Sequence, residues 1–324
     1  SYTVDAPSVL AFDGAVRTLQ AGSGVSGSGA AHVINSASLV SSGSFEPHDL
    51  RIDSGGLLQI DSAAPQLIQT LLLQSATLTG NAEVRIGTYF DWRNGGGLDS
   101  VGASPGPVVI QSGAVLEMCA GICTLSNRVL RIEGLADWRG GVVEVPMAAA
   151  AKISIALGGT LQTSAVKSAA QFRCAAPTCT AEMEVVGTLR EIGDGANFAL
   201  TAPLLINGGT LTGNDASFVT SGVTVTSGTI DLAGGELVTD PVILNGGALR
   251  GNGLVDGNVS NLAGRVQPGA SPGRIDILGS YTQGPAGILD IEVGGLAPGV
   301  DSDFLFASAA SSIDGTLNVI DAGY

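Results

Sequence analysis

The chain has 324 residues, a formal net charge of −15, 48 glycines and only 4 % aromatic residues. Its 14 basic residues are scattered, which excludes the clustered lysines and arginines that nucleic acid requires. No stretch approaches the roughly 20 apolar residues of a membrane span, so we expect no membrane insertion by this segment. Hydrophobic residues make up 44 %, which predicts a folded core built from Leu, Val, Ile and Ala.

The chain opens without the basic start and apolar run of a signal peptide, so we expect a mature or trimmed product or an internal fragment. Residues 1–30 would form an N-terminal cap or the first coils. Their Gly/Ser-rich part, 21–30, fits either a linker or two adjacent coil corners. The strand-like residues 31–34 follow directly, which favours corners. We therefore predict that residues 1–324 form one continuous domain.

Strand patterns fill the chain from there on. Residues 67–74 are the best helix candidate, but they run into the strand-like residues 76–80 without a cap, so we predict a strand. Apolar and polar residues alternate in 82–86, 222–226 and 274–278, which is typical of half-buried strands. The sequence therefore predicts an all-β protein.

One phrase recurs, in which a glycine precedes alternating apolar and polar residues. It occurs at 56–60, 159–162, 187–190, 209–212, 228–232, 247–250, 287–291 and 315–319. A period near 20 residues with one short strand per phrase indicates a solenoid. We expect two or three strands of about four residues per coil, with parallel ladders at about 4.8 Å and inward rows of like residues. At about 21 residues per coil, the chain would make about 15 coils.

Four cysteines form two close pairs, Cys119 with Cys123 and Cys174 with Cys179. We predict two local disulfides and hence an oxidising compartment. Cross-pairing between the two loops stays open. A zinc site is the competing interpretation, but these spacings differ from the common short knuckle.

Two tryptophans stand in a shared phrase, Asp-Trp-Arg followed by Gly-Gly, at residues 91–96 and 137–141. Trp92 and Trp138 are 46 residues apart, or about two coils, so stacked rings would lie about 10 Å apart. With Arg93 and Arg139 beside them, exposed rings could bind successive sugars of a polysaccharide. The alternative is that both rings are buried in the coil, each with an arginine on its face.

The carboxylates do not predict a catalytic centre. The closest groupings are Asp53 with Asp61, Glu182 with Glu184 and Asp301 with Asp303. Alternating acids on one strand are typical of a solvated face, and no Ser/His/Asp or Cys/His set is apparent. Calcium at residues 301–303 would lack the glycine-rich repeat of calcium-binding β-rolls. We therefore expect no catalytic residue, no metal and no cofactor.

From about residue 200 onward the sequence resembles the β-helical passengers of secreted bacterial surface proteins, meaning autotransporter passengers and filamentous-haemagglutinin-like exoproteins. The resemblance is carried by residues 245–259, 264–273, 279–283, 303–305 and 313–319. The Pro-Gly-x-Ser-Pro-Gly turn at 268–273 is its most specific part, and the two Asp-Trp-Arg phrases resemble large exoproteins as well. The resemblance implies a right-handed, single-stranded parallel β-helix, secretion, and adhesion, aggregation or surface display.

We therefore expect a non-enzymatic, extracellular or cell-surface bacterial protein that acts as a rigid adhesive or structural stalk. Its partners would be a polysaccharide or another surface protein. A polysaccharide lyase or hydrolase on the same fold is the first alternative, and a groove of Asp, Arg and Lys on one face would favour it. A self-associating filament subunit is the second alternative, and matching bare ends would favour that.

Overall fold

The computed structural model describes residues 1–324 apart from 103, 120, 164–169, 193–196, 270 and 324. The described residues form strands, turns and bends, with no helix, and the strands pair in parallel as a β-solenoid. Contacts group the chain into two compact units. The first is Ser1–Leu161 with Ala170–Ala181, and the second is Gln162–Ala169 with Glu182–Tyr324.

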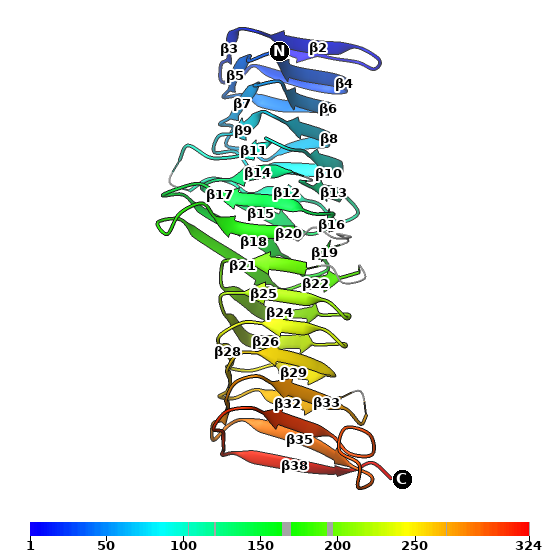
Figure 1. The fold of residues 1–324 in the computed structure, drawn as a ribbon. Coiled ribbons are helices and arrows are strands. Elements are labelled where there is room, and N and C mark those ends of the chain that lie inside the picture. The colour runs from blue at the N-terminus through cyan, green and yellow to red at the C-terminus, as the bar shows by residue number, and fades with distance from the viewer. Residues whose placement is uncertain (103, 120, 164–169, 193–196, 270, 324) are drawn as a thin grey trace. The chain divides into compact units, whose positions relative to one another are not determined.

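In each unit a coil contributes two strand segments to a first sheet and one segment to a second sheet. In the first unit, the first sheet contains β1 (Tyr2–Thr3), β2 (Val9–Asp13), β4 (Gly24–Ile34), β6 (Ser44–Asp53), β8 (Gln66–Gln74), β10 (Val84–Trp92), β12 (Val108–Ile110), β13 (Val115–Met118), β15 (Arg128–Ile132), β16 (Leu135–Trp138) and β18 (Ala150–Ile155). Its second sheet contains β3 (Val16–Leu19), β5 (Ser38–Ser41), β7 (Leu57–Ile60), β9 (Thr77–Thr79), β11 (Gly97–Leu98), β14 (Ile122–Leu125), β17 (Gly141–Val145) and β20 (Ala170–Cys174) (Figure 1).

The second unit repeats this plan. Its first sheet contains β22 (Thr188–Glu191), β24 (Leu204–Thr212), β26 (Val223–Asp231), β28 (Val242–Leu244), β29 (Ala248–Gly251), β31 (Val259–Asn261), β32 (Arg265–Pro268), β34 (Tyr281–Gln283), β35 (Ile288–Val293), β37 (Ser312–Ile313) and β38 (Thr316–Asp321). Its second sheet contains β23 (Asn197–Leu200), β25 (Ser217–Thr220), β27 (Glu236–Val238), β30 (Gly253–Asp256), β33 (Arg274–Ile277) and β36 (Phe304–Ala307). The strands β19 (Thr160–Thr163) and β21 (Thr180–Val185) contain the boundaries between the units.

The core consists of rows of like residues, as the sequence predicted. One row in the second sheet of the first unit pairs Leu39, Leu58, Leu78, Leu98 and Leu125 in turn, and all five are fully buried. A row in the first sheet pairs Ile68, Ile86, Ile110, Ile132 and Ile155, which are also fully buried. Burial of each such side chain stabilises the fold by roughly 1.5–3 kcal/mol. The period-2 alternation leaves the residues between them on the outer face.

The recurrent glycines mark a corner where successive coils touch through their backbones. Gly228 has a φ of +93°, and a Cβ there would lie 2.2 Å from the carbonyl oxygen of Gly209. In the next coil, a Cβ on Gly247 would lie 2.5 Å from the carbonyl oxygen of Gly228. Only glycine fits such a contact, which explains why the phrase returns once per coil in the second unit.

The solenoid makes about 13 turns of about 21 residues, so the predicted count of 15 was slightly too high. The reason is that some coils carry extra residues between their strands. The Asn81 nitrogen donates to the Asp61 carboxylate 20 residues back, whereas Phe172 lies 29 residues beyond its partner Val143. Leu305 lies 30 residues beyond its partner Ile275. Because these coils are longer, a chain of 324 residues makes fewer coils.

Two uncertain segments are resolved by the strand bounds. Residues 67–74 belong to β8, so the strand prediction is confirmed over the helix. The Gly/Ser-rich stretch 21–30 runs into β4, whose pairing with β6 shifts register between Gly27 and Ala30. That shift is a bend between two strand segments, which is the corner expected from the sequence. The prediction of one continuous domain stays a prediction.

Candidate functional site

The two Asp-Trp-Arg phrases occupy equivalent positions on β10 and β16. Met118 pairs with Trp138. Asp91 pairs with Glu117, so the next residues along the two strands, Trp92 and Met118, occupy equivalent positions. The two rings are thus two coils apart with Met118 between them, at the predicted spacing.

Both rings face the core. Trp92 is 1 % exposed and Trp138 is 0 % exposed. The Trp92 indole nitrogen donates to the carbonyl oxygen of Gly96 at 3.0 Å, and its ring stacks on Phe90 with 6.1 Å between centroids. The hypothesis of sugar stacking required exposed rings, so neither ring offers a face for stacking, although Trp92 borders the first cavity described below. Their large apolar area stabilises the coil instead.

The residues that flank the rings face outward because side chains alternate along a strand. Asp91, Glu117 and Asp137 pair in turn on three successive strands of the first sheet, β10, β13 and β16. Three carboxylates thus follow one another at about 4.8 Å steps. Like charges at paired positions destabilise a sheet, so this register needs compensation.

Two exposed arginines supply the compensation. Arg93 reaches Asp91 in its own coil, with its Nη2 atom 2.5 Å from Oδ2. Arg139 reaches two coils, with 2.8 Å from Nε to Asp137 Oδ2 and 3.1 Å from Nη2 to Glu117 Oε1. The arginine side chains are 54 % and 60 % exposed, whereas that of Asp91 is 15 % exposed. The arginines therefore form the outermost layer over the carboxylates.

These side chains line two adjoining cavities on the outer face of the first unit. The first cavity, about 420 Å³, is bordered by Gln74, Asp91, Arg93, Asn94, Glu117 and Arg139. The second, about 250 Å³, is bordered by His32, Asp49, Arg51, Thr70, Leu72 and Tyr89. Asp91 and Arg93 border both, so the two cavities adjoin at this ion pair. We call them together the outer groove.

Protonation in the outer groove is set by these contacts. The hydrogen bond to Asp91 raises the pKa of Arg93, and the hydrogen bond to Asp137 with the charge of Glu117 raises the pKa of Arg139. Burial, with a hydrogen bond to Glu117, raises the pKa of Tyr89 to about 12. Burial and the charge of Arg51 lower the pKa of His32. At neutral pH the groove thus presents cationic arginines, a neutral phenol and a neutral imidazole.

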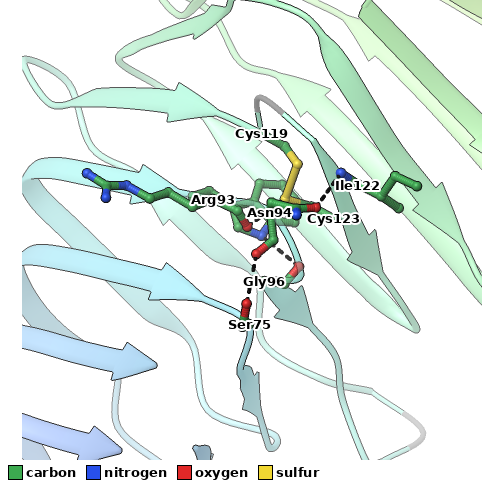
Figure 2. The surroundings of a disulfide bond; sticks show 8 residues. Ser75, Arg93, Asn94, Gly96, Cys119, Ile122 and Cys123 are labelled. Carbon is green, nitrogen blue, oxygen red and sulfur yellow. Dashed lines mark hydrogen bonds between the residues drawn. A yellow bond between two sulfur atoms is a disulfide. The ribbon is translucent and has the colours of Figure 1, made fainter. Parts of the chain in front are cut away.

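A disulfide lies at the rim of the groove. Cys119 and Cys123 are bonded, and the sulfur of Cys123 lies 3.0 Å from the carbonyl oxygen of Arg93 (Figure 2). Asn94 accepts a hydrogen bond from the Ile122 nitrogen at 2.9 Å, while the Arg93 side chain points away from the disulfide. The linked turn thus packs against the residues that follow Trp92. It ties the coil that carries Arg93 to the coil that carries Glu117.

The second disulfide joins Cys174 and Cys179. Both predicted local pairings are therefore confirmed, and cross-pairing between the two loops does not occur. Disulfides of this kind belong to an oxidising compartment.

The other predicted acidic groups lie elsewhere and act structurally. Asp53 binds Arg51 and Ser54, and Asp61 accepts hydrogen bonds from Gln59 and from the Asn81 nitrogen. Glu182 and Glu184 share one face of β21, as the alternation predicted.

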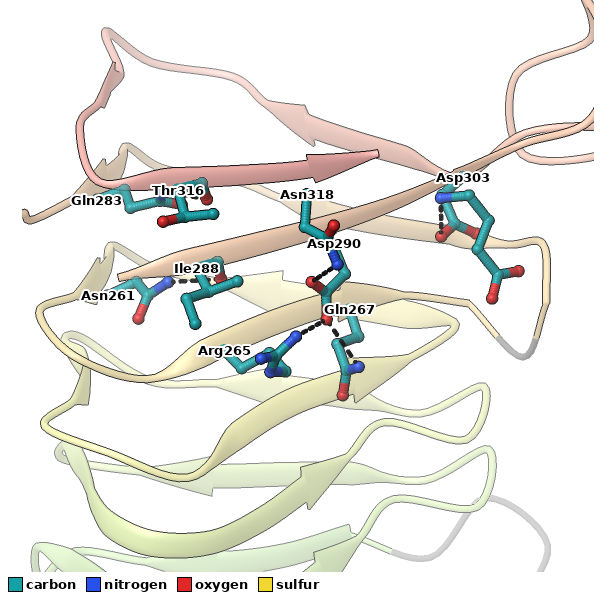
Figure 3. Close-up of polar contacts among 10 residues, drawn as sticks. Asn261, Arg265, Gln267, Gln283, Ile288, Asp290, Asp303, Thr316 and Asn318 are labelled. Atoms are coloured by element: carbon teal, nitrogen blue, oxygen red, sulfur yellow. Dashed lines mark hydrogen bonds and ion pairs between the residues drawn. The ribbon is translucent and has the colours of Figure 1, made fainter. Parts of the chain in front are cut away.

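Asp303, labelled in Figure 3, is 8 % exposed. It accepts two backbone hydrogen bonds, from Gly273 at 2.8 Å and from Glu292 at 2.9 Å. Asp301 accepts a bond from the Ala297 nitrogen. Among the described residues, no three His, Cys, Asp or Glu side chains gather in a way that could hold a metal ion. In the same residues, no helix is long and apolar enough to cross a membrane.

The sequence pointed to only part of the outer groove. The phrase Asp-Trp-Arg itself signals that Asp91 and Arg93 share a face opposite the ring, because they are two residues apart on a strand. Glu117, Tyr89 and Arg51 were missed, since only the pairing register between coils brings them to the same place.

Comparisons of the chain with protein-family models, with curated proteins and with solved structures find no match. The resemblance to secreted bacterial surface proteins therefore stays a prediction, and function has to be argued from the site.

Proposed function

We propose that this chain is a non-enzymatic, extracellular stalk of a bacterial surface protein, and that the outer groove is its adhesive site for polysaccharide. The observation that carries the proposal is the register of Asp91, Glu117 and Asp137 on three successive coils. Arg93 and Arg139 offset the repulsion between these acids, and the resulting exposed charged groups border a cavity, which supports a binding surface.

The chemistry of the groove suits sugar hydroxyl groups. Carboxylates accept hydrogen bonds and guanidinium groups donate them, and both are planar groups that can address two neighbouring hydroxyls. Gln74 and Asn94 add amide groups at the same cavity. A few convergent polar groups in a concave site are typical of small-ligand and oligosaccharide binding.

The rest of the molecule supports a stalk. Each coil contacts its neighbours through ladders of buried leucine and isoleucine, so rigidity comes from repetition. The two disulfides support an extracellular location. Self-association and filament formation stay predictions.

The test is a panel of insoluble and soluble polysaccharides, scored for retention of the protein and for shortening of the polymer. We expect retention without shortening, and loss of retention in the double variant Asp91→Asn with Glu117→Gln. The matched control is Asp231→Asn, which changes an outward acid paired with Arg250 in the second unit. Equal retention by the double variant and the control would refute the groove as the adhesive site.

A hydrolase is the second candidate, because carboxylates on adjacent strands are a favourable starting geometry. Asp91 and Glu117 pair on adjacent strands, and a glycosidase likewise needs two carboxyl groups in one site. Shortening of a polysaccharide in the same panel, abolished by Glu117→Gln, would establish this activity and overturn the non-enzymatic proposal.

A further inference from the structure

The outer groove extends along the stacking direction of the coils. One column of paired outward residues runs from His32 through Arg51, Leu72, Asp91 and Glu117 to Asp137. Five inter-strand steps correspond to about 24 Å. That is the length of an extended oligosaccharide site rather than of a site for one sugar.

The charges that line the groove are balanced. The two cavities are lined by three guanidinium groups, from Arg51, Arg93 and Arg139, and by three carboxylates, from Asp49, Asp91 and Glu117. Arg51 and Arg139 also pair with Asp53 and Asp137, which line neither cavity. The chain as a whole carries −15, so this balance is local. A polyanion would be repelled by the overall field, and a polycation would meet three fixed guanidinium groups.

The second cavity includes less polar side chains between its charged groups. Leu72 and Tyr89 are partly exposed and border the second cavity, between Arg51 on one side and Asp91 on the other. Burial and Glu117 raise the pKa of the Tyr89 phenol to about 12, so the phenol is neutral at pH 7. A pyranose ring has an apolar C–H face that can pack on such a surface while its hydroxyls reach the charged groups.

Resting on the proposed adhesive function, we propose that the outer groove binds a neutral, hydroxyl-rich polysaccharide that lies along the coil axis and occupies both cavities. Arg93 and Asp91 stand where the two cavities join and contact the middle of the bound chain. Arg51 and Arg139 contact its two ends.

The experiment uses calorimetric titration of the whole chain with neutral β-linked gluco-oligosaccharides, from disaccharide to octasaccharide. We expect affinity to rise with length until the ligand spans about 24 Å, and then to level off. Arg51→Gln should weaken binding of the long oligosaccharides about tenfold, because one set of charge-assisted hydrogen bonds is lost. The same variant should leave binding of the shortest ligands nearly unchanged, since these fit the cavity around Arg139.

Controls separate this inference from the proposed function. Arg250→Gln, on the outer face of the second unit, should leave all affinities unchanged. Polygalacturonate and polyglucosamine serve as the charged probes. Tighter binding of either charged polymer, or affinity independent of length, would overturn the neutral extended site while keeping an adhesive groove. If no glycan of any charge binds, both proposals fail.

Discussion

The two units place their outward acidic residues differently along the stacked coils. In the second unit, acids alternate with their partners along the coils: Asp231 pairs with Arg250, and Asp290 binds Gln267 at 2.9 Å and Asn318 at 3.1 Å (Figure 3). Each of these bonds crosses from one coil to the next. In the first unit, Asp91, Glu117 and Asp137 follow one another without such alternation.

This difference separates outward residues that stabilise the solenoid from outward residues that border a cavity. Cross-coil bonds such as that from Arg250 to Asp231, at 3.0 Å, connect neighbours that already pair through their backbones. Arg93 instead binds within its own coil, and only Arg139 bridges two acids. The second unit therefore uses its polar face for cohesion, whereas the first keeps charged groups at an open groove.

One buried ionisable residue in each unit extends the comparison. In the first unit, Arg128 is 2 % exposed and donates to the carbonyl oxygens of Asp99 at 2.9 Å and Ala82 at 2.6 Å. Burial lowers the pKa of Arg128 to about 10, so it stays charged at neutral pH. In the second unit, Glu191 is 1 % exposed, and no described residue donates a hydrogen bond to its carboxyl oxygens.

The largest expected effect is that of Arg128→Met on the first unit. The change leaves two buried carbonyl oxygens without a donor, so we expect the free energy of unfolding to fall by about 3 kcal/mol. Trp92 and Trp138 both lie in the first unit, so tryptophan fluorescence during denaturant unfolding measures its stability. The control is Arg131→Met, whose half-exposed side chain pairs with Glu133. A loss no larger than that of the control would contradict a structural role for Arg128.

The next effect is a pH dependence of the second unit. Burial raises the pKa of Glu191 from its ordinary 4.5 to about 8. Between these values the folded state holds a proton that the unfolded state releases, so stability is complete below about pH 4.5 and falls as pH rises toward 8. The slope should approach 1.4 kcal/mol per pH unit.

Far-UV circular dichroism across a urea series at several pH values measures this loss. Glu191→Gln removes the titrating group, so its unfolding midpoint should depend much less on pH in the same range. If wild type and variant show the same pH profile, Glu191 is not the group responsible.

The smallest expected effect compares outward acids of the two units. Neutralising one acid should raise the free energy of unfolding of its unit, and neutralising the other should lower it. Glu117→Gln removes the middle charge of three like neighbours. It also breaks the pair with Arg139, but that arginine keeps Asp137, so we expect a net stabilisation of the first unit by about 0.5 kcal/mol. Asp231→Asn removes a cross-coil ion pair, and we expect it to destabilise the second unit by a similar amount. Both effects should shrink at high salt. If both variants stabilise their units, or both destabilise them, the proposed difference between the two units is wrong.

Much of the fold followed from local pattern. The glycine phrase predicted one corner per coil, because contacts such as that between Gly228 and Gly209 leave no room for a Cβ. Alternation predicted the rows of leucine and isoleucine, and the cysteine spacing predicted both disulfides. The coil count was harder, because extra residues in long coils do not disturb the pattern of the strands.

The site was predicted only in outline. The Asp-Trp-Arg phrase marked the right coils, but the sequence could not decide which face held the ring and which the arginine. The structure decided it: Trp92 and Trp138 are buried with Met118 between them, and Arg93 and Arg139 cover carboxylates outside.

Local sequence patterns specify a parallel solenoid with local disulfides, because strands, corners and short loops depend on residues within about 20 positions. The neighbours of each outward residue are set by the pairing of whole coils. Asp91 and Glu117 lie 26 positions apart in a chain whose coils vary in length, so their meeting depends on the register of backbone hydrogen bonds between coils. The fold also buries Glu191, which raises its pKa, whereas the acids of the outer groove stay near its arginines.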